Sequence, residues 1–278
     1  MRIFVTGGTG FVGKNFIKLA LLNGHKIYAI SRKKQKKAKK NLIWLHGKLT
    51  DDWRKELKKS DVIVHLASIG VLKKKVTYLE AFNTNVIESF LFFQNAYKSN
   101  CINWIIAGSS SEYGKSLKDK KNMSYNSLTI PVTNYELTKN IFSNMIFNFS
   151  KYNKIKCRIM RIFPVYGPGE NKKRLWPSLI SAAKNNKIFY IDNPDLKREF
   201  YHIDSVVRDL LNSCDFKIKD NKFPQIWHVT SGKQMTILEF VKKEWKKINT
   251  ANNIFIKKTS NKNDNYHHLS DKKSIWTL

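Results

Sequence analysis

Residues 1–13 read Met1-Arg-Ile-Phe-Val-Thr-Gly7-Gly8-Thr-Gly10-Phe-Val-Gly13, a short apolar strand that leads directly into closely spaced glycines. Gly8, Gly10 and Gly13 fit the glycine pattern of a dinucleotide-binding turn, and Gly7 extends that pattern. Such glycines allow a tight bend, admit phosphates where a β-carbon would clash, and bring helix and strand together. Residues 11–22 have the pattern of a helix whose free N–H groups and positive dipole end would face those phosphates. The chain is therefore predicted to begin with a nucleotide-binding site.

Short apolar runs alternate with helical patterns through the first two thirds of the chain. Strands are expected at residues 3–6, 26–30, 42–45, 62–66, 104–108 and 156–161, and helices at residues 11–22, 50–58, 78–98 and 133–151. This alternation is typical of a parallel sheet with helices on both faces, because right-handed crossovers place the helices there. The predicted fold class is therefore α/β, a doubly wound (Rossmann) parallel sheet.

The pattern loosens after about Gly167, where prolines interrupt it and shorter helices are expected at residues 175–185, 203–214 and 236–247. We interpret residues 1–166 as a dinucleotide-binding domain and residues 167–278 as a smaller, C-terminal substrate-binding subdomain, with borders that interleave. The polar tail at residues 259–278 is expected to be only partly ordered.

The charge of the chain is unusual, with 51 Lys and Arg against 21 Asp and Glu and a formal net charge of +30. Such a charge ordinarily indicates a polyanionic partner, such as nucleic acid or an anionic membrane. The excess is almost all lysine and is spread from end to end, so neither partner is expected. The densest basic run, at residues 32–40, is either a solvated loop or a rim that attracts a phosphate-rich ligand.

Other features of the sequence bear on the compartment. No apolar run approaches the ~18 residues of a membrane span, and the first residues lack the pattern of a signal peptide. Cys101, Cys157 and Cys214 are few, odd in number and far apart, which favours a reducing compartment over a disulfide framework. The expected localisation is cytoplasmic. His267 and His268 are adjacent, which is poor geometry for one metal ion, so no metal site is expected.

The end of the second strand, near Ser31, is where the adenosine ribose of a dinucleotide would lie. Proteins that prefer NAD usually place Asp or Glu here, since a carboxylate accepts hydrogen bonds from the ribose 2′-hydroxyl and repels a 2′-phosphate. This chain has Ser31 and Arg32 instead, and an arginine holds phosphate through paired charge-assisted hydrogen bonds. The predicted cofactor is NADP, with NAD as the alternative if Arg32 is only one more surface cation.

Two further segments carry chemistry: Ser109-Ser110-Ser111 after the fifth strand, and Tyr135 and Lys139 at the start of a long helix. Residues four apart rise from the same helical face, where an ammonium group can lower the pKa of a phenol from ~10 towards neutral. Tyr135 would then exchange a proton with a substrate hydroxyl or carbonyl, while Ser109 holds the same oxygen by a hydrogen bond. A hydride would move between the substrate carbon and a nicotinamide ring.

Together with the glycine turn, these segments resemble the extended short-chain dehydrogenase/reductase family, in its NAD-dependent epimerase/dehydratase branch. The resemblance covers roughly residues 1–235 and includes His65-Leu-Ala-Ser68, Asn83-Thr-Asn85-Val86, Arg161-Ile-Phe-Pro-Val-Tyr-Gly-Pro-Gly169, and Arg198-Glu-Phe200 before His202-Ile-Asp204. It implies a nucleotide-diphosphate sugar as substrate, a catalytic trio of Ser109, Tyr135 and Lys139, and a clamp on the diphosphate by Arg198.

The motifs and the resemblance together give a complete set of predicted site residues. The cofactor residues are Gly7, Thr9, Gly10, Phe11, Val12, Gly13, Ser31, Arg32, Leu49, Leu66, Ala67, Ser68, Lys139 and Ile162. The substrate residues are Ser110, Ser111 and Arg198.

The chain departs from relatives at positions that matter for the reaction. Sugar-nucleotide 4,6-dehydratases have an acid and a base directly after the catalytic hydroxyl residue, where this chain has Ser110 and Ser111. Neither serine can perform either role, so dehydration is not expected. Glu112 lies one position late and is interpreted as a supporting or structural residue. Pro164 replaces an Asn that helps many relatives to hold the substrate.

The expected function is NAD(P)-dependent oxidoreduction of a nucleotide-diphosphate sugar, by 4-keto reduction or C4 epimerisation, with Tyr135 as acid/base. A 2′-phosphate site favours the reductase, because net reductions commonly use NADPH. The alternative is a catalytically silent relative that binds RNA or a protein, for which the net charge of +30 is the best support.

One helix is predicted to need a second covering surface. Phe90, Leu91, Phe92 and Phe93 make the helix at residues 78–98 apolar around much of its girth. Family members pair this helix and the Tyr135 helix with their copies across a two-fold axis, so a homodimer is predicted.

Overall fold

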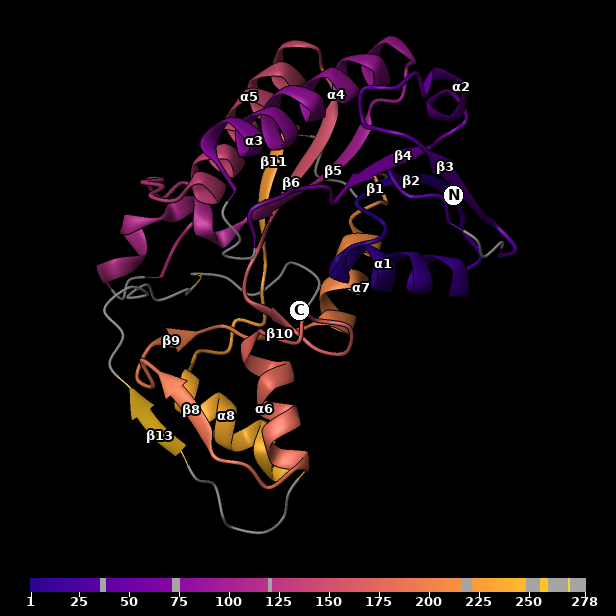
Figure 1. Cartoon of the computed structure of the whole chain (residues 1–278). Coiled ribbons are helices and arrows are strands. Elements are labelled where there is room, and N and C mark those ends of the chain that lie inside the picture. The colour runs from indigo at the N-terminus through magenta and orange to yellow at the C-terminus, as the bar shows by residue number, and fades with distance from the viewer. Residues whose placement is uncertain are drawn as a thin grey trace.

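A seven-stranded sheet lies at the centre of the computed structural model, which describes residues 1–35, 39–71, 76–119, 122–216, 222–248, 256–259 and 270. The strand order is β11-β6-β5-β4-β1-β2-β3, and every neighbouring pair is parallel. The strands are β1 Arg2–Thr6, β2 Lys26–Ser31, β3 Leu42–His46, β4 Val62–His65, β5 Asn103–Ser109, β6 Lys156–Ile162 and β11 Gln225–Val229. Helices cover both faces (Figure 1), so the predicted doubly wound fold is confirmed.

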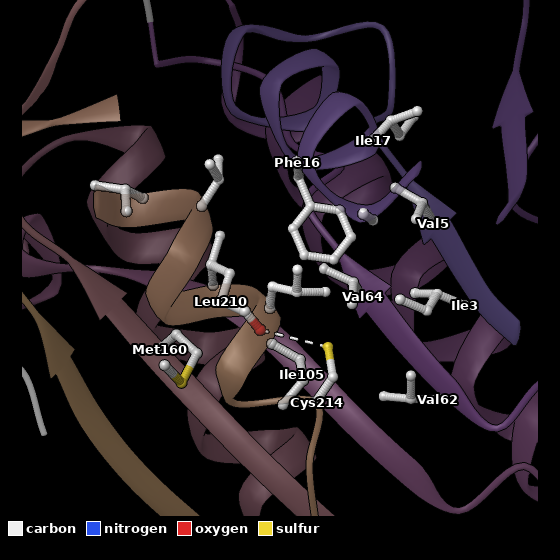
Figure 2. Close-up of a cluster of buried hydrophobic side chains, with 14 of the residues drawn as sticks. Ile3, Val5, Phe16, Ile17, Val62, Val64, Ile105, Met160, Leu210 and Cys214 are labelled. Carbon is white, nitrogen blue, oxygen red and sulfur yellow. Dashed lines mark hydrogen bonds between the residues drawn. The ribbon is translucent and has the colours of Figure 1, made fainter. Parts of the chain in front are cut away.

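The two faces of the sheet carry separate hydrophobic clusters, because successive strand residues point to opposite sides. Ile3 and Val5 pack in the cluster formed with α1 Phe11–Leu22 and α7 Ile203–Asn212, part of which Figure 2 shows. Phe4, between them, packs in the cluster formed with α4 Ser89–Lys98 and α5 Asn134–Tyr152. The alternation in β1 therefore fixes which helices lie on which face.

Helix starts carry clear signals in the sequence. The Thr133 side chain accepts a hydrogen bond from Glu136 N at 3.2 Å, and the Glu136 carboxylate accepts one from Thr133 N at 3.1 Å. This reciprocal cap fixes the first residue of α5 and so places Tyr135 in its first turn. The same Thr-x-x-Glu cap starts α3 Tyr78–Phe82 and α8 Ile237–Lys246.

The helix predicted over residues 78–98 is α-helical only at its two ends. It consists of α3, a π-helix over Asn83–Glu88, and α4. A π-helix inserts one extra residue per turn and is often found at functional sites. The helix predicted at residues 50–58 is shorter, since α2 spans only Arg54–Leu57 and Asp52 accepts a hydrogen bond from Arg54 N at its start.

The sequence did not predict β11, because Gln225 and His228 interrupt its apolar pattern. Both polar side chains are buried and find partners on other elements: Gln225 Oε1 accepts from Arg158 Nε of β6 at 3.2 Å, and His228 Nε2 lies 2.6 Å from the hydroxyl of Tyr113, on the 3₁₀-helix after β5. β11 and α7 come from the second half of the chain yet belong to the layers of the main sheet, so the two parts interleave along the sequence.

A second, smaller group of elements has its own core, in which Leu179, Ile191 and Trp245 are buried. It contains α6 Leu175–Lys184, β8 Phe189–Asp192, α8, and β13 Ile256–Thr259, which pairs with β8. Two short ribbons complete the fold, β9 Lys197–Arg198 with β12 Met235–Thr236, and β7 Val165–Tyr166 with β10 Tyr201–His202. Two 3₁₀-helices span Ser110–Tyr113 and Lys115–Asp119.

The cysteines and the helix lengths bear on two further expectations. Cys101, Cys157 and Cys214 are free and buried, and burial raises the pKa of each thiol to about 12. Within the described ranges, none of the helices is both long and apolar enough to cross a membrane. Most of the polar tail, with His267 and His268, and residues 36–38 of the basic run lie outside the described residues.

Candidate active site

The glycine turn after β1 leaves no room for side chains at two of its positions. Gly7 has φ +69°, and a β-carbon on it would lie 2.5 Å from the backbone of Leu66 and of Ala67. A β-carbon on Gly13 would collide with the Gly7 carbonyl oxygen, which also accepts a hydrogen bond from Gly10 N at 3.0 Å. The turn therefore brings β1, α1 and the loop after β4 into direct backbone contact.

The start of α1 is open to an anion. Its N-cap is Gly10, which offers no side-chain hydrogen bond, and the first turn of the helix contains no acidic residue. The N–H groups and positive dipole end of a helix start attract phosphate when nothing in the chain neutralises them. The glycine turn and this helix start therefore fit the pyrophosphate of a dinucleotide, and Gly7, Thr9, Gly10, Phe11, Val12 and Gly13 are the residues that could hold it.

The end of β2 forms a compact polar turn. The Ser31 hydroxyl donates to the Lys33 carbonyl oxygen at 2.7 Å and accepts from Gln35 Nε2 at 3.1 Å. Arg32 is exposed beside it. The chain therefore offers a hydroxyl and a guanidinium, without a carboxylate, at the place where a ribose is expected.

The loop after β4 connects the glycine turn to α5. Asn85, in the π-helix, accepts a hydrogen bond from Ile69 N at 2.8 Å and donates to Ile69 O at 3.1 Å and to Thr138 Oγ1 of α5 at 3.0 Å. Gly70, with φ +88°, lies against the Tyr135 side chain. Asn85 belongs to a motif of the sequence that carries no predicted role, and its amide fixes this loop to α5.

Ser109, Ser68 and Tyr135 converge at this loop. Ser109 is the last residue of β5, and Tyr135 lies in the first turn of α5. Burial raises the pKa of Tyr135 to about 12, while hydrogen bonding by the hydroxyls of Ser109 and Ser68 acts in the opposite direction. Ser68 was predicted only as a cofactor residue, and its action on the phenol is an addition that the structure makes.

Lys139 does not have the effect that the sequence predicted. Its buried Nζ donates to the Ala107 carbonyl oxygen on β5 at 2.5 Å, and burial lowers the pKa of the ammonium group. The charged groups that shift the pKa of Tyr135 are Glu112, which raises it, and Arg174, which lowers it. The predicted lowering of the Tyr135 pKa towards neutral is therefore wrong here, because burial dominates and the lysine bonds to backbone.

The predicted substrate serines lie on the 3₁₀-helix that follows Ser109. Ser110 is buried, and Ser111 donates its backbone N–H to Ser109 Oγ at 3.2 Å. Glu112, on the same helix, is wholly buried and ion-paired with Arg161. The interpretation of Glu112 as a supporting residue, and not as the acid or base of a dehydration, agrees with these contacts.

Three other predicted residues lie on different parts of the fold. Ile162 pairs with Ser109 across β5 and β6, and Leu49 is buried in the cluster on the α4 and α5 face. Arg198 lies on β9, paired with Met235. Its strand leads into Phe200 and His202, which line a cavity of about 170 Å³.

Arg174 was not predicted from the sequence as a site residue. It precedes α6, and its Nε lies 3.3 Å from the Glu170 carboxylate, yet its charge reaches Tyr135 from the second group of elements. In a chain with 51 basic residues no local pattern distinguishes it. The described part of the chain contains no cluster of three or more side chains able to hold a metal ion.

Comparison with known proteins adds to this geometry. A model of the "NAD dependent epimerase/dehydratase family" matches residues 3–217. The chain is 25% identical over 228 residues to Protein CapI of Staphylococcus aureus (74% of this chain, 67% of the relative). It is 26% identical over 235 residues to GDP-6-deoxy-D-talose 4-dehydrogenase of Aggregatibacter actinomycetemcomitans (80% and 72%), and 24% identical over 263 residues to dTDP-D-glucose 4,6-dehydratase of Bos taurus (87% and 71%).

Solved structures show the same fold. A UDP-N-acetylglucosamine 4-epimerase from Methanobrevibacter ruminantium, in complex with UDP-N-acetylmuramic acid, superposes with a TM-score of 0.85 at 23% identity (97% of this chain, 89% of that chain). MoeE5, in complex with UDP-glucuronic acid and NAD, superposes with a TM-score of 0.80 at 21% identity (99% and 89%).

Proposed function

Because this chain belongs to the NAD dependent epimerase/dehydratase family, we propose that it is an oxidoreductase that transfers hydride at C4 of a nucleotide-diphosphate sugar. The observation that carries the proposal is the convergence of Ser109, Ser68 and Tyr135 on a loop that touches the glycine turn. A relative that is a GDP-6-deoxy-D-talose 4-dehydrogenase supports C4 as the reacting carbon. A silent RNA-binding relative would have no physical need for this convergence.

The state of the phenol favours reduction of a 4-keto sugar. With a pKa of about 12, Tyr135 is protonated at neutral pH and suited to donate its proton to a carbonyl oxygen. A bound nicotinamide would supply the hydride to the same carbonyl group. Ser109 would hold the sugar oxygen, and Lys139, bonded to the Ala107 carbonyl, would contact the nicotinamide ribose. C4 epimerisation remains the alternative outcome of the same site.

We propose further that the protein does not dehydrate its substrate. Dehydratases are among its relatives, so family membership alone does not decide this point. The support comes from Ser110 and Ser111, which stand where an acid and a base are needed, and from Glu112, whose carboxylate is occupied by Arg161 and the Ser109 backbone.

The cofactor is proposed to be NADP. Ser31 and Arg32 offer a hydroxyl and a guanidinium at the end of β2, which suits a 2′-phosphate better than a bare 2′-hydroxyl. MoeE5 and a UDP-glucuronic acid 4-epimerase from Bacillus cereus were solved with NAD, so this preference would distinguish the present chain from them.

We expect the protein to oxidise NADPH when mixed with a nucleotide-linked 4-keto sugar and to release the 4-hydroxy sugar. Reduction of a ketone needs a proton on its oxygen and a hydride on its carbon, which Tyr135 and NADPH would supply. Nucleotide-linked 4-keto-6-deoxyhexoses are the substrates to test, with loss of NADPH absorbance and product identification by mass spectrometry. Loss of water from a 4-hydroxy nucleotide sugar would contradict the proposal, as would retention of RNA at physiological salt without turnover of any nucleotide sugar.

A homodimer is proposed through the outer face of α3 and α4, which lie beside α5 at the top of Figure 1. Phe92 and Phe93 do not contribute to this face, because both are fully buried against the sheet. Phe90 is covered by Phe149, with ring centroids 5.3 Å apart. The large hydrophobic side chains left exposed along α3, the π-helix and α4 are Tyr78, Leu79, Phe82, Ile87, Leu91 and Tyr97.

Light scattering at micromolar concentration should therefore give twice the chain mass of 32.5 kDa. Leu91→Glu, which places a charge in the middle of the exposed face, is expected to yield a monomer. Leu128→Glu is the matched control, since Leu128 is 70% exposed and lies outside these helices. A monomeric mass for the unaltered protein would refute the dimer.

A further inference from the structure

A buried ion pair lies directly behind the serine loop. Glu112 is 0% exposed and Arg161 is 3% exposed, and Glu112 Oε2 lies 3.0 Å from Arg161 Nε. Burying two charges is costly unless their remaining donors and acceptors also find partners. A pair buried this completely beside an active site therefore points to a role beyond surface stability.

The second oxygen of Glu112 holds the predicted catalytic serine. Oε1 accepts hydrogen bonds from the backbone N–H of Ser109 at 2.8 Å and from the Ser143 hydroxyl of α5 at 3.1 Å. A β-carbon on Gly108 would lie 2.9 Å from the same oxygen, so glycine is required there to admit the carboxylate. One carboxylate thus ties the end of β5 to the helix that carries Tyr135.

Arg161 is itself fixed from other elements. Its Nη1 donates to the Tyr113 hydroxyl at 2.8 Å and to the Tyr125 carbonyl oxygen at 3.0 Å, and its guanidinium lies 4.6 Å from the centroid of the Tyr113 ring. The Tyr113 hydroxyl lies 2.6 Å from His228 Nε2 on β11 and donates to Ser124 O at 2.8 Å. The ion pair is therefore held by β6, β11 and the loop before α5.

Glu112 is also the negative charge that faces the proton-transfer groups. Glu112, on the 3₁₀-helix, opposes ionisation of Tyr135, while Arg174, before α6, favours it. Glu112 also raises the pKa of Lys139 on α5, whereas burial lowers it. Lys139 in turn lowers the pKa of His65 on β4. Arg161 faces Glu112 and Tyr113.

We propose that Glu112, anchored by Arg161, is a positioning residue for the reduction: it fixes the backbone of Ser109 and keeps a negative charge facing Tyr135 and Lys139. The inference rests on the proposed function and adds to it. Glu112 would favour the protonated form of Tyr135, against the effect of Arg174, because a nearby negative charge disfavours the phenolate.

Glu112→Gln tests the proposal, since glutamine has nearly the same shape and keeps an oxygen for Ser109 N–H but loses the charge. We expect kcat for 4-keto sugar reduction to fall about ten-fold, with KM and cofactor Kd unchanged. The phenol should ionise more easily, so the alkaline limb of the kcat profile should move to lower pH by about one unit. Glu56→Gln, on α2, is the control and should match the unaltered protein.

A folded Glu112→Gln variant with unchanged kcat and an unchanged alkaline limb would overturn the inference. If that variant does not fold, because Arg161 is then buried without a counter-charge, Ser143→Ala provides the test. It removes one donor to Glu112 and keeps both charges, so kcat should fall about three-fold without a shift of the limb; an unchanged kcat would overturn the inference. Absence of reductase activity in the unaltered protein would instead refute the proposed function.

Discussion

Tyr135→Phe is expected to lower kcat for 4-keto sugar reduction by about 10²–10⁴-fold, the usual contribution of a positioned proton donor. Phenylalanine fills the same space in the first turn of α5 but leaves the carbonyl oxygen without a proton as hydride arrives. Because the glycine turn and the start of α1 are untouched, cofactor Kd should not change. Steady-state kinetics combined with cofactor titration separates the two effects.

Tyr152→Phe is the matched control for this prediction. Tyr152 ends the same helix and is 88% exposed, so the loss of its hydroxyl should leave kcat and stability unchanged. A Tyr135→Phe variant that keeps the turnover of the control would show that the phenol is not the proton donor.

NADP is expected to bind about 10- to 100-fold more tightly than NAD, because a paired charge-assisted hydrogen bond from Arg32 to the 2′-phosphate contributes about 1.5–3 kcal/mol. Arg32→Ala should remove most of this difference by weakening NADP binding, with little effect on NAD. Isothermal titration calorimetry with both cofactors measures the two constants directly.

Arg54→Ala serves as the control for the loss of one surface cation. Arg54 lies at the start of α2, and its guanidinium is paired with the Asp52 carboxylate at 2.5 Å. It should change neither Kd. Equal affinity for the two cofactors, or tighter binding of NAD, would contradict the NADP assignment and align this chain with relatives solved with NAD.

Much of the fold follows from local sequence signals. The glycine turn, the apolar strands and the Thr-x-x-Glu caps all act within a few residues of one another, which is why α1 and the start of α5 lie close to where the sequence predicts them. β11 was missed because Gln225 Oε1 and His228 find their partners in Arg158 and Tyr113, which are distant in the sequence. The π-helix around Asn85 was missed for the same reason, since its amide bonds to a loop and to another helix.

The set of site residues stays a prediction, whereas the contacts of two of its members differ from those expected. Helical spacing correctly puts Tyr135 and Lys139 on one face of α5, but spacing says nothing about what each side chain meets there. Lys139 bonds to the Ala107 carbonyl, and burial raises the pKa of Tyr135 to about 12, so the predicted acidic phenol becomes a protonated one. Only the packing of β5 against α5 reveals this, and a protonated phenol agrees with the reduction that Ser31 and Arg32 already favoured in the sequence.

Hydride transfer to C4 can be followed with NADPH that carries deuterium at both positions of the reactive nicotinamide carbon, mixed with a nucleotide-linked 4-keto sugar. We expect a product that carries deuterium at C4, formed rapidly by the unaltered protein and about 10²–10⁴-fold more slowly by Tyr135→Phe. An unlabelled product, a label at another carbon, or equal rates of labelling in the two proteins would contradict this expectation.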